Sequence, residues 1–176
     1  MLLKPAVKAD YAAIIDLANL AYRGTGPSAS WNIENFIEGQ RINESLLREE
    51  LAAKPHAYLL TYRDEPDDPD APLLGTVLLD PGQDGVWYLG LLTIHPEMQK
   101  RKLGRALLVA AEDFAKQHGA HRIQMTVVNV RDILIAWYER RGYTLTQETR
   151  PFPYGDERFG RPLRDDLYFV VLEKDI

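Results

Sequence analysis

The sequence of 176 residues contains no cysteine and only four histidines. The absence of cysteine excludes disulfides, thiol nucleophiles and metal sites built on thiolates. The histidines do not follow one another at the spacing that puts two metal ligands on one face of a helix; they are His56, His95, His118 and His121. We therefore expect no metal site, and any group transfer is expected to run without a cysteine-bound intermediate.

Long hydrophobic runs and an excess of positive charge are also missing. No apolar run approaches the ~20 residues that span a bilayer, and the opening MLLKPAVKAD lacks the apolar stretch of a secretory signal. The net charge of −5 argues against a nucleic-acid-binding surface, which is basic overall. We expect a cytoplasmic protein that binds neither membrane nor nucleic acid, with room for one local basic patch facing an anionic ligand.

What is present is a normal globular composition, with 45% hydrophobic and 27% charged residues. The patterns predict helices at 11–22 (N-capped by Asp10 and stopped by Gly24, Gly26 and Pro27), at 31–38, from 44 to before Pro55, at 103–118 and at 133–141. They predict strands near the N-terminus and at 57–63, 72–80, 86–94, 122–128, from Tyr143 and at 167–173, with a long loop at 150–166. This order predicts a single mixed α/β domain over residues 1–176.

The stretch QKRKLGR, residues 99–105, places four basic residues around Gly104 just before a helix. Exposed N–H groups and the positive end of a helix dipole favour a diphosphate at such a helix start, here Gln99–Ala106. Gly104 lets the backbone come close to a ligand. Taken alone, the same run also fits a solvated basic turn.

Two segments resemble one family. A buried strand ending in LLTIHPEMQ followed by KLGRALL, and then NVRDILIAWYERRGY, look like the acetyl-CoA motif and a later segment of the GNAT N-acetyltransferase superfamily. The resemblance spans residues 86–145. It implies a central, mostly antiparallel mixed sheet of six to seven strands flanked by helices. It also implies acetyl-CoA as cofactor and direct transfer of an acetyl group to a primary amine of a small molecule or peptide.

The resemblance assigns cofactor contacts by position. By the resemblance, main-chain groups of one strand hold the pantetheine arm, at Leu92, Thr93 and Ile94. The helix start holds the diphosphate, at Gln99, Lys100, Arg101, Lys102, Leu103, Gly104, Arg105 and Ala106. A strand-to-helix connection adds the polar side chains of Asn129 and Arg131. Lys102 departs from the family pattern, which has a small residue there. If that position requires a positive φ, lysine costs about 1 kcal/mol, which several phosphate contacts exceed.

Tyr138 is the predicted general acid, because a phenol beside the departing sulfur can protonate it. For an arbitrary tyrosine next to Trp137 the alternative is an aromatic core residue. No general base is evident on the central strands. Four carboxylates from flanking segments, Glu34, Glu38, Asp156 and Glu157, are expected to be exposed, and a water relay or an already neutral amine needs no dedicated base.

The acceptor side is expected from the stretch WNIENFIEGQR and the loop at 150–166, with Tyr22, Arg23, Trp31, Glu34 and Arg41 as candidate contacts. Arg23, Arg41, Arg158 and Arg161 either hold a substrate carboxylate or pair with the chain's own carboxylates. An amino acid, a peptide terminus, a polyamine and an antibiotic all remain open as acceptors, and we expect a homodimer. The alternative function is a non-catalytic module that binds acyl-CoA or regulates, whereas a nucleotide-phosphate loop does not match QKRKLGRA.

Overall fold

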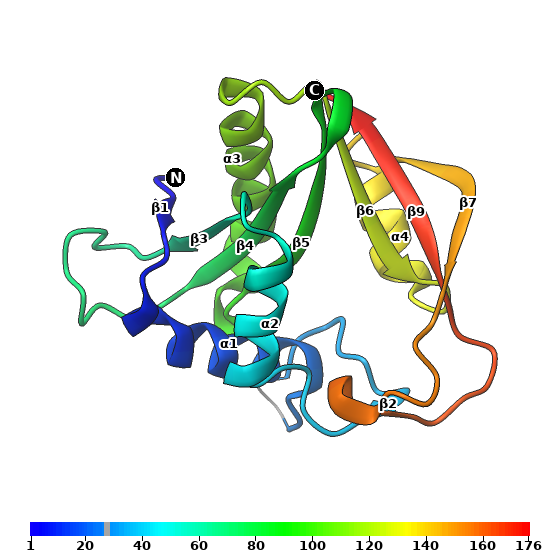
Figure 1. Ribbon diagram of the computed structural model, residues 1–176. Coiled ribbons are helices and arrows are strands. Elements are labelled where there is room, and N and C mark those ends of the chain that lie inside the picture. The colour runs from blue at the N-terminus through cyan, green and yellow to red at the C-terminus, as the bar shows by residue number, and fades with distance from the viewer. Residues whose placement is uncertain (27–28) are drawn as a thin grey trace.

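The computed structural model describes residues 1–26 and 29–176, and these form one seven-stranded sheet with helices on both faces (Figure 1). The strand order is β1-β3-β4-β5-β6-β9-β7. The bounds are β1 Lys4–Pro5, β3 Tyr58–Tyr62, β4 Gly75–Pro81, β5 Val86–Ile94, β6 Arg122–Val128, β7 Thr144–Pro151 and β9 Tyr168–Asp175. Neighbouring strands are antiparallel except β5 and β6, which are parallel. The predicted mixed, mostly antiparallel α/β class is confirmed.

The helices divide the core into two layers. The apolar stripes of α1 (Tyr11–Arg23) and α2 (Glu44–Ala53) pack with Leu59, Leu78 and Leu91 on one face of the sheet. On the other face, α3 (Leu103–Gln117) and α4 (Asp132–Glu139) pack with strand residues that include Val77 and Leu89. Consecutive residues of β4 alternate between the layers, as the two-residue period of a strand requires.

Most predicted element boundaries agree with the structure. Strands β5 and β6 have the predicted bounds, and β5 ends at Ile94, immediately before His95 and Pro96. Helix α2 begins after Asn43, whose side chain accepts a hydrogen bond from the Leu46 N–H at 2.9 Å. Helix α3 ends before Gly119, which has a φ of +96°. Local capping and turn chemistry therefore fixes these boundaries.

Three local predictions were wrong. Residues 31–38 form turns and the short strand β2 (Ile37–Glu38), not a helix. The segment 150–166 contains the end of β7, the 3₁₀ turn η4 (Glu157–Phe159) and β8 (Arg161–Pro162), so it is not structureless. Strands β2 and β8 pair with each other. Their structure depends on this pairing across the chain, which the local periodicity of each segment cannot show.

The third wrong prediction is the cap of the first helix. Helix α1 does begin at Tyr11, but the side chain of Asp10 does not cap it. A 3₁₀ turn, η1 (Lys8–Asp10), precedes the helix, and the Asp10 carboxylate accepts the Val7 N–H at 2.8 Å and pairs with Arg63 at 2.8 Å. Asp10 thus closes the preceding turn and ties it to the end of β3. Of the predicted stop signals, Pro27 lies outside the described residues, and α1 ends at Arg23 before Gly24.

The parallel strands β5 and β6 separate part of the way along their length. They pair only from Val86↔Arg122 to Tyr88↔Gln124, although both strands continue beyond these residues. In Figure 1 the two arrows diverge from the end near the C-terminus. The peptide groups of β5 beyond Tyr88 therefore have no strand neighbour on the β6 side. Backbone polar groups away from water need partners, so this gap is a natural position for an extended ligand.

A bulge lies in β5 beside this gap. Leu78 pairs with Gly90 and Thr76 with Thr93, so β5 carries one residue more than β4 between these pairs. Leu91 adopts a left-handed backbone with a φ of +51°. The extra residue changes the face on which the following side chains lie. As a result Leu89 packs with the α3 layer, whereas Leu91, two residues later, packs with the α1 layer. The bulge therefore re-aims the peptide groups of 91–94 at the point where the strands separate.

Candidate active site

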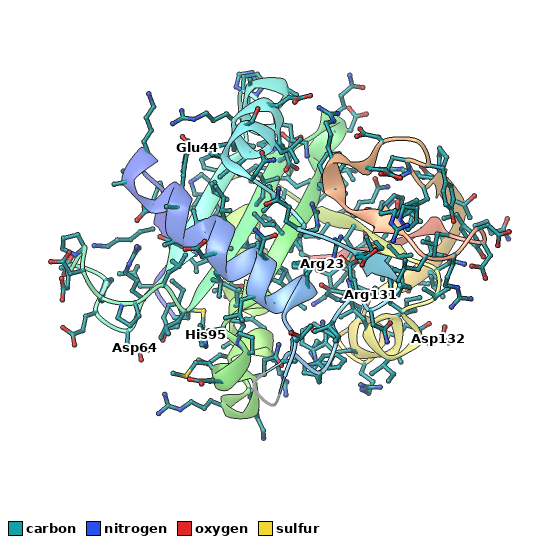
Figure 2. All side chains as sticks on the ribbon, turned by 90° about the horizontal axis from the view of Figure 1, so that it is seen from below. Arg23, Glu44, Asp64, His95, Arg131 and Asp132 are labelled. Atoms are coloured by element: carbon teal, nitrogen blue, oxygen red, sulfur yellow. The ribbon has the colours of Figure 1, made fainter. Side chains whose placement is uncertain are left out.

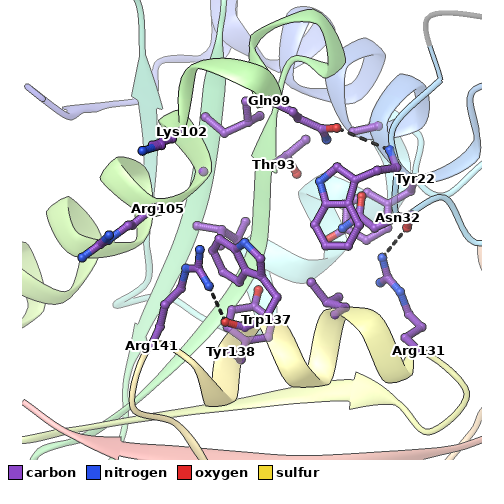
Figure 3. A pocket seen from close by; sticks show the side chains of 16 residues that line it. Tyr22, Asn32, Thr93, Gln99, Lys102, Arg105, Arg131, Trp137, Tyr138 and Arg141 are labelled. Carbon is purple, nitrogen blue, oxygen red and sulfur yellow. Dashed lines mark hydrogen bonds between the residues drawn. The ribbon is translucent and has the colours of Figure 1, made fainter.

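A cavity of about 300 Å³, here called the wedge cavity, lies where β5 leaves β6. Figure 3 shows it between the end of β5, the start of α3 and the helix α4. Its lining comes from four segments: Ala21 and Tyr22; Trp31 and Asn32; Leu92, Thr93, Ile94, Gln99, Lys102, Gly104 and Arg105; and Arg131, Leu134, Trp137, Tyr138 and Arg141. The main-chain groups left by the strand separation and the first turn of α3 thus face one space.

The start of α3 has the geometry expected of an anion site. The helix begins at Leu103, and Lys102 before it is left-handed, with φ 60° and ψ 18°. The backbone at this position does require a positive φ, so lysine is strained there by about 1 kcal/mol. Gly104 faces Trp137, whose ring lies 3.7 Å from the position of an added Cβ. Lys102 and Arg105 both line the wedge cavity and bring positive charge to the helix N-terminus.

Arg141 is a cationic lining residue that the sequence reasoning missed. Its guanidinium lies 3.6 Å from the centre of the Trp137 ring and donates to the Trp137 carbonyl oxygen at 2.6 Å (Figure 3). Its Nε is buried and has no hydrogen-bond partner within the described residues. Burial lowers the pKa of Arg141, with further contributions from Arg140 and Arg105. The four-residue spacing of Trp137 and Arg141 could have indicated this pair, because such residues are neighbours on a helix.

The other contacts predicted from β5 and the helix start lie in different places. Leu92, Thr93, Ile94 and Gln99 line the wedge cavity, and Gln99 also bonds Ser30 at 2.7 Å and accepts the Trp31 N–H at 3.4 Å. Arg101 and Ala106 line a shallow groove beside α3 and the N-terminus, whereas Leu103 packs against the core. The side chain of Lys100 lies outside the described part of the chain.

Asn129 is held away from the lining residues of this cavity. Its side-chain amide donates to the Asp166 carbonyl oxygen at 3.1 Å and accepts the Tyr168 N–H at 3.0 Å. Its backbone N–H bonds the Tyr168 carbonyl oxygen at 2.9 Å. These contacts fasten the end of β6 to the start of β9, and the predicted cofactor contact of Asn129 stays a prediction.

A second cavity, of about 460 Å³, is lined in part by two segments that pair with each other, 31–41 and 152–163, and is here called the cover cavity. Pairing of Ile37 with Pro162, and a hydrogen bond of 2.9 Å from the Leu163 N–H to the Phe36 carbonyl oxygen, join the two segments. The aromatic and apolar lining includes Tyr88, Met125, Phe152, Phe159 and Phe169. Its charged lining residues are Arg23, Arg41, Arg131, Glu34, Glu49 and Glu50.

Glu34 is the main correction among the carboxylates, since it is buried, with its side chain only 6% exposed. It pairs with Arg23 at 3.3 Å and with Arg131 at 3.5 Å, and these arginine side chains are 8% and 10% exposed. Arg23 also donates to the carbonyl oxygens of Gly39 and Phe159, both at 2.9 Å. Figure 2 shows Arg23 at the end of α1 and Arg131 at the start of α4. Glu34 thus connects helices that are far apart in sequence.

Of the four arginines proposed for a substrate carboxylate, three are engaged by the protein's own carboxylates. Arg23 pairs with Glu34, Arg158 with Asp156 and Glu49 on the surface, and Arg161 with Glu38. Arg41 differs. Within the described residues its guanidinium is in no ion pair and donates no hydrogen bond, and it lies 5.4 Å from the ring centre of Tyr22 and 5.9 Å from that of Phe159.

The two cavities meet at a common set of residues: Tyr22, Leu92, Arg131, Leu134 and Tyr138 line both. Tyr138 is buried in the last turn of α4. Its ring makes edge contacts with Trp137 and Tyr143 at 5.1 Å and 5.6 Å between centres. Burial raises the pKa of Tyr138, so its phenol stays protonated at neutral pH.

The bulged strand, the strand separation and the positively charged start of α3 lie in the part of the chain that matches a family model. The model of the acetyltransferase (GNAT) family matches residues 12–143. The chain belongs to the GNAT acetyltransferase family. GNAT enzymes generally take their acetyl group from acetyl-CoA and act on amines of small molecules or proteins.

Solved structures of other GNAT acetyltransferases share the fold over nearly the whole chain. The ribosomal-protein-S18-alanine N-acetyltransferase of Escherichia coli has a TM-score of 0.67 and 16% identity, covering 99% of this chain and 93% of its own. The ribosomal-protein-alanine N-acetyltransferase of Brucella melitensis has a TM-score of 0.66 and 15% identity, covering 100% of both chains. Nourseothricin acetyltransferase has a TM-score of 0.64 and 18% identity, covering 99% and 97%. At these identities the likeness concerns the fold.

The residues of the wedge cavity fit the acetyl-CoA that this GNAT domain is expected to use. The separated strands offer main-chain groups to an extended pantetheine arm. The buried Nε of Arg141, which has no hydrogen-bond partner among the described residues, is a further donor. Across residues 1–26 and 29–176, no helix is long and apolar enough to cross a membrane. The same residues bring together no group of three or more His, Asp or Glu side chains suited to a metal ion.

Proposed function

We propose that the chain is an acetyl-CoA-dependent N-acetyltransferase, which moves an acetyl group directly to a primary amine of a small molecule or peptide. One observation carries this proposal: a cavity at the strand separation and a second, aromatic cavity share Tyr138 in their common wall. The first has the backbone and cationic groups that suit a diphosphate and a pantetheine arm. The second has the size range and mostly apolar lining of a small-molecule site.

Acetyl-CoA, when bound, supplies the activated acetyl group. Lys102, Arg105 and Arg141 would hold the diphosphate together with the first N–H groups of α3. Main-chain groups of Leu92, Thr93 and Ile94 would hold the pantetheine arm, and an N–H near Ile94 would stabilise negative charge on the acetyl oxygen. The apolar lining around Leu134 and Trp137 limits access of water to the thioester.

Tyr138 holds the proton for the leaving sulfur. As the acceptor nitrogen forms its bond to the acetyl carbon, the carbon–sulfur bond breaks and the Tyr138 hydroxyl donates its proton to the sulfur. The acceptor attacks as the neutral amine, and the proton that its nitrogen loses on becoming an amide passes to water, directly or through a relay. Solvent then returns a proton to Tyr138. Glu34 is not assigned the role of base, because two guanidinium groups already engage its carboxylate.

The test is turnover with purified protein, acetyl-CoA and a panel of amines that includes amino acids, short peptides and polyamines. We expect acetyl-CoA to raise the melting temperature, free CoA to be released with at least one amine, and mass spectrometry to detect the matching N-acetyl product. Binding of acetyl-CoA with no release for any amine would favour the non-catalytic acyl-CoA-binding module. The homodimer and the cytoplasmic location stay predictions for chromatography and cell fractionation.

A further inference from the structure

Arg41 differs from the other two arginines of the cover cavity, because among the described residues no carboxylate pairs with it. Arg23 and Arg131 share Glu34. The other two acidic lining residues have partners of their own, since Glu49 pairs with Arg158 and Glu50 with Lys54. The cavity lining carries three guanidiniums and three carboxylates, and among the described residues Glu34 is the one carboxylate that pairs with any of these guanidiniums. Close to the Tyr22 ring, which lies 5.4 Å from the Arg41 guanidinium carbon and 5.7 Å from that of Arg131, positive charge therefore exceeds negative charge.

The surroundings of Arg41 fix its position and leave its N–H groups available. Its guanidinium carbon lies over the rings of Tyr22 and Phe159, so aromatic contacts hold the planar group in place. The backbone N–H groups of Arg41 and Ile42 donate to the Asn19 side-chain oxygen at 2.6 Å and 3.1 Å, which anchors the chain at its base. A half-buried guanidinium with five donors and a fixed orientation matches a carboxylate.

The position of Arg41 relative to the reaction centre restricts the ligand further. Tyr22 contacts Arg41 on one side and lines both cavities where they meet at Tyr138. A carboxylate bound by Arg41 would therefore lie beside Tyr22, one of the five residues that line both cavities. The rest of the cavity is lined by aromatic and apolar side chains such as Tyr88, Phe152 and Phe169. A ligand there needs an amine and a carboxylate close together and an apolar body.

We propose that the acceptor is an amino-carboxylic acid with an apolar or aromatic side chain, and that Arg41 recognises its carboxylate. This inference rests on the proposed function, because it places the acceptor amine at the junction beside Tyr138. The proposal favours amino-carboxylic acids over polyamines and other cationic acceptors. The additional positive charges of such acceptors would face the guanidinium of Arg41, while Glu49 and Glu50 already pair with Arg158 and Lys54.

The experiment compares three amines that differ at one group: L-phenylalanine, L-phenylalanine amide and 2-phenylethylamine, with L-leucine, leucine amide and spermidine added. Release of free CoA is measured at fixed pH. We expect kcat/KM for each amino acid to exceed that for its amide by ~10–100-fold, the range for charge-assisted hydrogen bonds. The amide's amino group is less basic and so more often neutral, which works against the expected result and makes the comparison conservative.

Variants connect this preference to Arg41. In Arg41→Gln the ratio of acid to amide should fall to within about threefold of unity, and Arg41→Lys should retain part of it because the charge remains without the planar fork. Arg161→Gln is the control, since Arg161 belongs to β8 in the same cover but lines the outer surface and pairs with Glu38. This control should keep the wild-type ratio.

The outcomes separate the two proposals. CoA release with equal or better use of the amides, or with spermidine as the best acceptor, overturns the carboxylate inference and leaves the proposed acetyltransferase standing. An unchanged ratio in Arg41→Gln also overturns it, provided that the variant melts cooperatively and binds acetyl-CoA. No release with any amine, despite acetyl-CoA binding, contradicts the proposed function itself and removes the inference with it. If Arg41→Gln does not fold, the wild-type ratios still decide the acceptor class.

Discussion

The wedge cavity and the cover cavity meet at the same five residues but are built in different ways. The wedge cavity depends on main-chain groups of β5, on the first turn of α3 and on one face of α4, so two continuous stretches supply most of its lining. The cover cavity takes side chains from segments between Tyr22 and Phe169 and is closed by a buried ion cluster and by β2–β8 pairing. The main-chain groups of the wedge cavity suit a cofactor common to a whole family. The cover cavity is lined by side chains from segments far apart in the sequence, and these can vary with the acceptor.

The largest expected effect tests whether Glu34 holds segments 31–41 and 152–163 in place over the cover cavity. Glu34→Ala leaves the buried guanidiniums of Arg23 and Arg131 without their shared carboxylate, and breaking a buried pair in this way costs about 3–5 kcal/mol of unfolding free energy. Urea unfolding followed by circular dichroism measures the change. The control Glu38→Ala removes a carboxylate whose side chain is 61% exposed and should leave the midpoint unchanged. Equal unfolding midpoints for both variants would show that the Arg23–Glu34–Arg131 ion pairs do not hold these segments in place.

The second effect tests the residue where the two cavities meet. Tyr138→Phe keeps the ring in its aromatic surroundings and removes the hydroxyl, so we expect kcat to fall about 100-fold while the Kd for acetyl-CoA changes by less than about twofold. Single-turnover CoA release and calorimetry measure the two quantities. Tyr168→Phe makes the same chemical change at an exposed residue that lines neither cavity and should have no effect. Unchanged single-turnover rates in Tyr138→Phe would remove the phenol from the mechanism.

The pH dependence of Tyr138 follows from its burial. Burial raises its pKa above the ordinary value of 10.0, and a general acid works only while protonated. Activity that depends on this proton is therefore present below the raised pKa and is lost as the pH rises through it. We expect no alkaline fall in kcat from Tyr138 at any pH below 10. A fall centred near pH 8 in the wild type that is absent from Tyr138→Phe would contradict this assignment.

A smaller effect tests the cationic wall of the wedge cavity. Arg141→Met preserves the apolar contact with Trp137 and removes the charge, so we expect the Kd for acetyl-CoA to rise about 10-fold, with a larger rise at low salt. Isothermal titration at two salt concentrations measures it. Arg140→Met removes a neighbouring exposed charge that lines neither cavity and should change the Kd far less. Equal losses in both variants would indicate only a long-range field.

The smallest effect separates the strain at Lys102 from its charge. Lys102→Gly relieves a left-handed backbone and should raise the unfolding free energy without ligand by about 1 kcal/mol. It also removes a charge at the start of α3, so acetyl-CoA should bind roughly threefold more weakly. Lys102→Ala keeps the Cβ and the strain but loses the charge, so it should show the weaker binding without the gain in stability. Denaturant unfolding and titration with acetyl-CoA, done on both variants, distinguish the effect of backbone strain from the effect of charge.

Much of the fold could be predicted from local sequence patterns. The strands at 86–94 and 122–128 are runs of apolar and β-branched residues, and α2 begins after Asn43, which caps it. The segment 31–38 has apolar residues at helical spacing and was wrongly predicted as a helix. Its actual form depends on β8, more than a hundred residues later, and on the burial of Glu34. Local periodicity carries no information about such partners.

The candidate site divides in the same way. The helix start at Gln99–Ala106, the strand residues Leu92–Ile94 and the position of Tyr138 follow from short motifs, because backbone groups and glycine positions are encoded locally. Arg141 was missed since a basic residue at the end of a helix is ordinarily a surface residue, and here stacking on Trp137 brings it to the cavity. Glu34 was expected to be exposed because a single carboxylate in a polar stretch usually is.

By itself, the sequence determined the order of the main strands and helices and the helix start that suits a diphosphate. The structure decided that Lys102 adopts a left-handed backbone there. The tertiary structure alone decided which charges are paired. Arg23, Arg158 and Arg161 have carboxylate partners, and Arg41 has none within residues 1–26 and 29–176, although all four are similar arginines in the sequence. The physical reason is that charge pairing and desolvation depend on distances of a few ångström between segments that lie far apart along the chain.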